Sequence, residues 1–152
     1  MKELTMDKLT EKDANFQLKA NTQKEVLQQL AQLAFERGKV ADAQTFYQEL
    51  CKREEESTTG FGNGVAIPHA RHSIVKEAGV LVARTDNDIE WNALDDEPVN
   101  VFICLIAPDD QNDFHLKTLS KISRRLIHDD FIDTLKHASQ PEVLEEINQI
   151  IV

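Results

Sequence analysis

The sequence predicts an α/β fold, a single-domain sandwich in which a mixed central sheet is flanked by helices, over residues 1–152. Amphipathic helical stripes lie toward both ends of the chain, with short strand-like segments between them. The near-continuous apolar run Val99–Ala107, bounded by Pro98 and Pro108, is typical of a strand buried on both faces. A chain of 152 residues without a repeat or a flexible linker has the usual size of one domain.

Two helices are expected in the first third of the chain. Before them, residues 15–20 alternate apolar and polar side chains, which predicts a short half-buried strand. Thr22 and Glu25 have the spacing of a capping box, and the stripe behind them ends at Gly38. Asp42 can cap a second helix, which ends in the charged residues 52–56. The apolar positions of the two stripes are Val26, Leu27, Leu30, Leu33 and Ala34, then Ala43, Phe46, Tyr47, Leu50 and Cys51.

The middle of the chain is strand-like, and the last third is helical again. A turn-rich loop at 57–64 leads into the short apolar run 65–67, and residues 79–83 form a further expected strand before the run at 99–107. A helical pattern resumes at Phe114, and Ser139 with Glu142 resembles another capping box. The apolar positions of these helices are Leu116, Leu119, Ile122 and Leu126, then Val143, Leu144, Ile147, Ile150 and Ile151.

The composition argues against several classes of function. With 17 Lys and Arg against 27 Asp and Glu, the formal net charge is −10, which disfavours a general nucleic-acid binder and suits partners with basic patches. The longest apolar run, Val101–Ala107, is far shorter than the ~20 residues of a membrane span, and no signal-peptide core follows Met1. We therefore expect a cytoplasmic protein that does not insert into a membrane. Cys51 and Cys104 are expected to be reduced thiols in the core.

The most informative segment for chemistry runs from Thr59 to His69. Three glycines in five residues allow positive φ and a close approach to a ligand, and such a loop can direct several N–H groups at an anion. A short strand then places His69 directly after Pro68. Taken alone, the segment is more typical of a surface turn followed by an incidental histidine, because short Gly-rich loops are common and this one is neither a P-loop nor a G-x-G-x-x-G.

Within this segment, the run Gly-Asn-Gly-Val-Ala-Ile-Pro-His resembles the active-site signature of a family of enzyme IIA domains. These are the fructose/mannitol (type 2) domains of the bacterial phosphoenolpyruvate-dependent sugar phosphotransferase system, a class that also includes the nitrogen-regulatory IIA proteins. The resemblance covers about residues 5–150. The further matching features are the Arg53-Glu54 pair, Trp91, the stretch 95–99, the turn Ala107-Pro108 and the pair His115-Leu116.

The resemblance implies a phosphoryl relay in which His69 accepts a phosphoryl group from the phosphocarrier HPr and passes it to a cysteine of a IIB domain. The positions that match the family's second histidine and its arginine are His115 and Arg53. Residue chemistry agrees with these roles, because a neutral imidazole with a pKa of about 6.5 is nucleophilic at cytoplasmic pH. Phosphoryl transfer needs neutralisation of the equatorial oxygens, which the guanidinium of Arg53 and a hydrogen bond from His115 could supply.

Three residues of the Gly-rich loop are expected to help stabilise the phosphoryl group: Thr58, Thr59 and Gly64. The two threonines could equally serve to fix the loop. No metal or organic cofactor is expected. His72 forms a His-x-x-His pair with His69, a spacing that some metal sites use, but the spacing of the acidic residues suggests no third ligand.

Other polar residues receive no catalytic role. The cluster Asp109, Asp110 and Asp113 is expected to face outward, either to dock a basic partner or simply as a solvated loop, and His128 and His137 are expected to face solvent.

Two alternative functions remain open at this point. The protein could be a regulatory phosphoprotein similar to the nitrogen-related IIA proteins, or a non-catalytic docking module of the same fold. The joint presence of Arg53, His69 and His115 argues against the docking module. The downstream acceptor that would separate transport from regulation is not part of this chain, and neither is the component that recognises the sugar.

Overall fold

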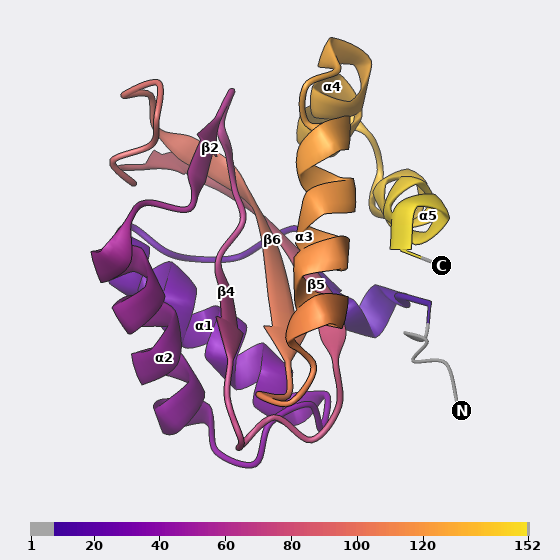
Figure 1. Cartoon of the computed structure of the whole chain (residues 1–152). Helices are drawn as coiled ribbons and strands as arrows, with labels where there is room; N and C mark the ends of the chain where they lie inside the picture. Colours follow the sequence, from indigo (N-terminus) through magenta and orange to yellow (C-terminus); the bar gives the residue numbers. More distant parts are fainter. Residues whose placement is uncertain (1–7, 152) are drawn as a thin grey trace.

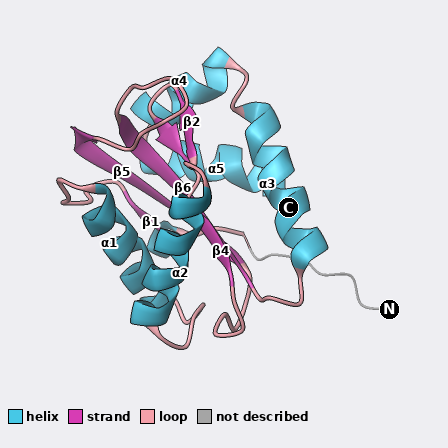
Figure 2. Cartoon of the chain, turned by 60° about the vertical axis from the view of Figure 1, so that its left-hand side comes forward, coloured by secondary structure: helices cyan, strands magenta, loops and turns pink. Residues whose placement is uncertain are grey.

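A mixed six-stranded sheet forms the centre of the molecule in the computed structural model, which describes residues 8–151, and α-helices cover both of its faces (Figures 1 and 2). The predicted fold class is confirmed. The strand order is β1-β5-β6-β3-β2, and β4 pairs with the same central strand β6. The strands are β1 (Ala14–Asn15), β2 (Gly60–Gly62), β3 (Val65–Ala66), β4 (His69–Arg71), β5 (Gly79–Ile89) and β6 (Val99–Ala107).

Strand β6 is the axis of the sheet. It runs antiparallel to β5 on one side, and on the other side it pairs in parallel first with β3 and then with β4. Eight of its nine residues are buried, so the predicted burial on both faces is confirmed. Phe102 and Cys104 belong to the core on one face of the sheet, whereas Ile103 and Leu105 belong to the core on the other.

The helices divide between the two faces. α1 (Gln23–Glu36) and α2 (Ala43–Glu56) pack on the face of Phe102, and α3 (Asn112–Arg125), α4 (Asp129–His137) and α5 (Gln140–Ile151) pack on the face of Ile103. The predicted caps of the first two helices are confirmed: the side chain of Thr22 accepts a hydrogen bond from the N–H of Glu25, and that of Asp42 accepts one from the N–H of Thr45.

The strand predicted at residues 15–20 is wrong beyond its first residue. Only Ala14 and Asn15 pair with β5, and a turn follows. The side chain of Asn15 accepts a hydrogen bond from the N–H of Gln17, an Asx-type contact that favours a turn over continued pairing. Leu18 is nevertheless buried. The alternation of apolar and polar residues therefore indicated which side chains are buried, although the segment is not a strand.

The prediction for the third helix is also wrong in detail. The helix begins at Asn112, and Leu116, expected on the buried stripe, is 52% exposed. The other three predicted residues, Leu119, Ile122 and Leu126, do pack against the core, and His115 and Thr118 are buried on the same face. The buried face therefore includes two polar residues that hydropathy did not assign to it. The strand predicted at 79–83 extends further, to Ile89.

Several predictions about single residues can also be compared with the structure. Cys104 is fully buried, and burial raises the pKa of its thiol to about 12, while Cys51 is half-buried against the α1–α2 side of the core. His128 and His137 are exposed, as predicted. The acidic cluster Asp109, Asp110 and Asp113 is exposed as well. Over the described part of the chain, no helix is both long and apolar enough to cross a membrane.

Candidate functional site

A cavity of about 300 Å³ lies where the end of α2, the strand β4 and the start of α3 meet. Figures 1 and 2 show β4 between these two helices. Arg53 comes from the last turn of α2, His69 opens β4, and His115 lies in the first turn of α3. The structure therefore brings these three predicted residues to one cavity from three elements. The remaining lining residues are Glu49, Lys52, Glu56, Ala70, Arg71, Asn112 and Leu116.

The imidazole of His69 is held at both ring nitrogens. Its Nδ1 lies 2.8 Å from the carbonyl oxygen of Ile67, and the Nε of Arg53 donates to its Nε2 at 3.1 Å. Because a carbonyl only accepts, Nδ1 carries the proton and donates it, and Nε2 presents its lone pair. The nitrogen that can act as a nucleophile therefore faces the guanidinium of Arg53.

Local sequence explains how these two side chains reach their positions. Pro68 has no N–H to donate, but its carbonyl accepts from the N–H of Leu105, and the chain then continues in parallel pairing with His69 opposite Leu105. Arg53 is held by its own helix end, where Nη1 donates to the carbonyl oxygen of Ser57 at 2.8 Å.

The second histidine is buried beside the first. His115 is only 6% exposed, and its ring centroid lies 5.3 Å from that of His69. Burial, followed by the proximity of His69, Arg71 and Arg53, lowers the pKa of His115 to about 4. Burial and the charge of Arg53 also lower the pKa of His69, opposed by its hydrogen bond to Ile67 and by Glu56. Both imidazoles are therefore neutral at neutral pH.

The three residues expected from the Gly-rich loop lie elsewhere. Thr59 is buried, and both its N–H and its hydroxyl donate to the carboxylate of Glu54. The hydroxyl of Thr58 accepts from the N–H of Gly60. Gly64, at φ 83°, packs against Lys136 and Asn100 at the far end of the β3–β6 pairing. None of the three lines the cavity around His69.

Two polar residues near the site received no role from the sequence. Arg71 lines the cavity, but no strand was expected after Pro68, so the alternation along β4 that places Arg71 on the side of His69 could not be used as a signal. Glu54 ties the end of α2 to Thr59, and burial raises the pKa of its carboxyl above the ordinary value while the bonds to Thr59 lower it. No local pattern predicts that contact, because it depends on how β2 passes the end of the helix.

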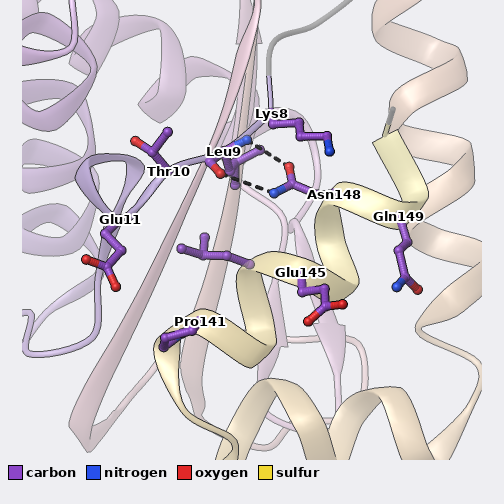
Figure 3. A pocket seen from close by; sticks show the side chains of 9 residues that line it. Lys8, Leu9, Thr10, Glu11, Pro141, Glu145, Asn148 and Gln149 are labelled. Atoms are coloured by element: carbon purple, nitrogen blue, oxygen red, sulfur yellow. Dashed lines mark hydrogen bonds between the residues drawn. The ribbon is translucent and has the colours of Figure 1, made fainter.

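A larger cavity, of about 700 Å³, lies between the N-terminal segment and α5 (Figure 3). Its described lining contains no histidine, cysteine or arginine. The side chain of Asn148 accepts from the N–H of Leu9 at 2.7 Å and donates to the carbonyl oxygen of Leu9 at 3.1 Å, as the dashed lines in Figure 3 show. These contacts hold the segment against the helix and offer no reactive group, so the smaller cavity is the candidate site.

Within residues 8–151, no group of three or more His, Cys, Asp or Glu side chains lies close enough together to hold a metal ion. The Nδ1 of His72 accepts a hydrogen bond from the N–H of Ile74 at 3.0 Å. That contact explains the position of His72 as part of a local turn.

Comparison with known proteins gives matches along nearly the whole chain. The family described as "Phosphoenolpyruvate-dependent sugar phosphotransferase system, EIIA 2" matches residues 7–150. The fructose-like EIIA component of the phosphotransferase system of Escherichia coli K12 is 37% identical over 146 residues, which cover 96% of this chain and 99% of that protein. A nitrogen regulatory protein of Pseudomonas aeruginosa is 36% identical over 126 residues, which cover 83% of this chain and 82% of that one. The resemblance inferred from the motif is confirmed.

Solved structures share the fold. The nitrogen regulatory protein IIA-Ntr of Neisseria meningitidis superposes with a TM-score of 0.82 at 28% identity, covering 93% of this chain and 94% of that one. Enzyme IIAMTL of Escherichia coli, solved in a complex with phosphorylated enzyme IIBMTL, superposes with a TM-score of 0.79 at 21% identity, covering 93% of this chain and 98% of that one.

Proposed function

The chain belongs to the EIIA 2 family of the phosphoenolpyruvate-dependent sugar phosphotransferase system, and on that premise we propose that it carries a phosphoryl group on Nε2 of His69. One observation carries the proposal. Nε2 presents a lone pair toward the guanidinium of Arg53, while Nδ1 donates to the carbonyl oxygen of Ile67. A nucleophilic nitrogen and a positive charge are thus already paired at one cavity.

The proposed step is an exchange of P–N bonds. The lone pair of His69 Nε2 attacks the phosphorus of phosphohistidine on the donor, HPr, and the bond between phosphorus and the donor nitrogen breaks. The proton on Nδ1 stays in place, and the carbonyl of Ile67 stabilises the positive charge that the ring gains. In the next step a cysteine thiolate of a IIB domain or subunit attacks the phosphorus, and His69 Nε2 leaves with its lone pair.

Arg53 and His115 have supporting roles in both directions. Arg53 can move its Nε–H from the free lone pair to a phosphoryl oxygen when that lone pair becomes bonded to phosphorus. His115, neutral and beside the ring of His69, can donate one hydrogen bond but adds no charge. Thr58, Thr59 and Gly64 have no part in this step, because none of them lines the cavity.

A role in sugar uptake is favoured over a purely regulatory one. The fructose-like EIIA component matches this chain over almost its whole length and its own, whereas the nitrogen regulatory protein matches over about four fifths of each. The mannitol-type structural neighbour was solved with a phosphorylated IIB protein, which supports a IIB protein as the acceptor. The nitrogen-type alternative would use His69 in the same way and differ only downstream.

The test is covalent labelling. Incubation with phosphoenolpyruvate, enzyme I and HPr should add one acid-labile phosphoryl group to the wild type by intact mass, and none to His69→Ala. His137→Ala, at an exposed histidine of α4, is the matched control and should label like the wild type. Equal labelling of His69→Ala would refute the assignment. Transfer from purified phospho-HPr should survive excess chelator, and passage of the label to a IIB protein and then to sugar would separate uptake from regulation.

A further inference from the structure

A second arginine faces the cavity of His69. Arg71 is the last residue of β4, two positions after His69, and successive strand side chains alternate between faces. Ala70, between them, is buried in the core, so His69 and Arg71 project to the opposite side and line the same cavity. We propose that Arg71 is a second guanidinium ligand of the phosphoryl group on His69. This inference rests on the proposed function and adds a residue to its site.

The guanidinium of Arg71 is positioned without being neutralised. Its Nη1 donates to the carbonyl oxygen of Asp109 at 2.8 Å, in the loop between β6 and α3. Among residues 8–151 Arg71 forms no salt bridge, and neither does Arg53, whereas Arg37 and Arg125 are paired with carboxylates. The cavity is lined by the cations Lys52, Arg53 and Arg71 and by the carboxylates of Glu49 and Glu56, so positive charge prevails there only slightly, in a chain of net charge −10.

The other cation of the cavity is less suited to this role. Lys52 is exposed, as Arg71 is, but its ammonium lies 3.3 Å from the carboxylate of Glu49, so its charge is partly neutralised. Arg71 offers a planar fork whose Nε and Nη2 remain available after the bond to Asp109.

The phosphoryl group has more oxygens than Arg53 and His115 can satisfy, so a second arginine can donate to it as well. A phosphoryl group on a histidine has three outer oxygens, and Arg53 already uses Nη1 on the end of its own helix. His115 supplies no charge, because burial and the neighbouring cations keep it neutral, and Arg71 is one of the groups that lower its pKa. The positive charge that offsets the phosphoryl oxygens therefore comes from the two arginines.

The experiment compares Arg71→Gln and Arg71→Lys with the wild type in single-turnover phosphorylation by two donors. Phospho-HPr must dock, whereas phosphoramidate needs no protein contact, so a slower reaction with both donors reports on the phosphoryl group itself. Arg124→Gln, at an exposed arginine in the last turn of α3, is the matched control. We expect Arg71→Gln to be slower by about tenfold or more with both donors, toward the 10²–10³ typical of a preorganised donor, and Arg71→Lys to be intermediate.

A spectroscopic measurement accompanies the rates. In a ³¹P NMR titration of the phosphorylated protein, the phosphoryl pKa should rise in Arg71→Gln, because a neighbouring cation that favours the dianion is lost. Rates within threefold of the control with phosphoramidate, or an effect with phospho-HPr alone, would overturn the proposal and make Arg71 a docking residue at most. A wild type that takes no label from either donor would instead refute the proposed function.

Discussion

Two neighbouring segments of this chain show how differently a motif and its structure can distribute chemistry. The Gly-rich hairpin of β2 and β3 (60–66) carries the more conspicuous sequence pattern, whereas the His69 site is made of one strand start and two helix ends. In the structure the hairpin pairs with the beginning of β6 and β4 with its end, so the two segments lie at opposite ends of the same edge. The residues of the hairpin satisfy backbone and packing requirements, whereas the residues around His69 bring charged and nucleophilic groups together.

The glycines of the hairpin have packing reasons for being there. A Cβ on Gly60 would come within 2.7 Å of the backbone of Ala93, and Gly64 adopts φ 83° against Lys136. Asn63 also takes positive φ, and its N–H donates to the carboxylate of Asp95 at 2.9 Å. The Gly-rich pattern would permit ligand binding, but here its residues make contacts within the protein.

Of the substitutions in the two segments, Arg53→Gln should reduce the rate of phosphoryl transfer the most. Its guanidinium contacts the reactive nitrogen directly, and loss of one preorganised donor typically costs about 10²–10³ in rate, or roughly 2.7–4 kcal/mol. Arg53→Lys should recover only part of this loss, because an ammonium does not reproduce the planar fork. Rapid-quench transfer from phospho-HPr measures both, with circular dichroism as the control for folding. Rates within threefold of wild type in folded variants would mean that the charge of Arg53 is not used.

The pH dependence of stability should differ between the two segments. His115 titrates near pH 4 in the folded protein and near 6.5 when unfolded, so the unfolded chain takes up the proton first as pH falls. The protein therefore loses stability progressively between about pH 6.5 and 4, by on the order of 3 kcal/mol, since one pKa unit corresponds to about 1.4 kcal/mol. The carboxyl of Asp95 beside the hairpin has a lowered pKa, chiefly through the N–H of Asn63, so its contribution is lost only at more acid pH, below about its ordinary 3.8.

Urea denaturation of wild type and His115→Gln between pH 7.5 and 4.5 measures the effect. The wild type should lose stability relative to His115→Gln as the pH falls, while His137→Gln, at an exposed histidine, should follow the wild type. A difference between wild type and His115→Gln that does not change with pH would show that His115 titrates normally in the folded protein.

The smallest effect on transfer should come from Gly64→Ala. A side chain at φ 83° costs roughly 1–2 kcal/mol, and the new methyl would press on the flexible end of Lys136, which can move. The urea midpoint should fall, while transfer to His69 should stay within about threefold of wild type. A tenfold slower transfer at unchanged stability would mean that the Gly-rich hairpin does contribute to phosphoryl transfer.

Local sequence patterns were reliable where the structure depends on short-range chemistry. The caps at Thr22 and Asp42 form because a side-chain oxygen meets an N–H three residues on. The apolar run of β6 is buried on both faces because a strand of such residues is stable only between two layers. The segment after Asn15 failed as a strand because alternation reports burial and does not report which backbone groups find a pairing partner.

The sequence by itself determined the fold class and the caps, and through the family motif it predicted a site at Arg53, His69 and His115. Only the tertiary structure decided that these three share one cavity, that Arg71 joins them, and that Thr58, Thr59 and Gly64 do not. The physical reason is the same in each case. Whether a side chain reaches a site depends on the register of β4 against β6 and on the rotation of α3, which buries His115 and exposes Leu116. Those are long-range packing choices, set by which faces of the sheet and helices fit together, and no local period encodes them.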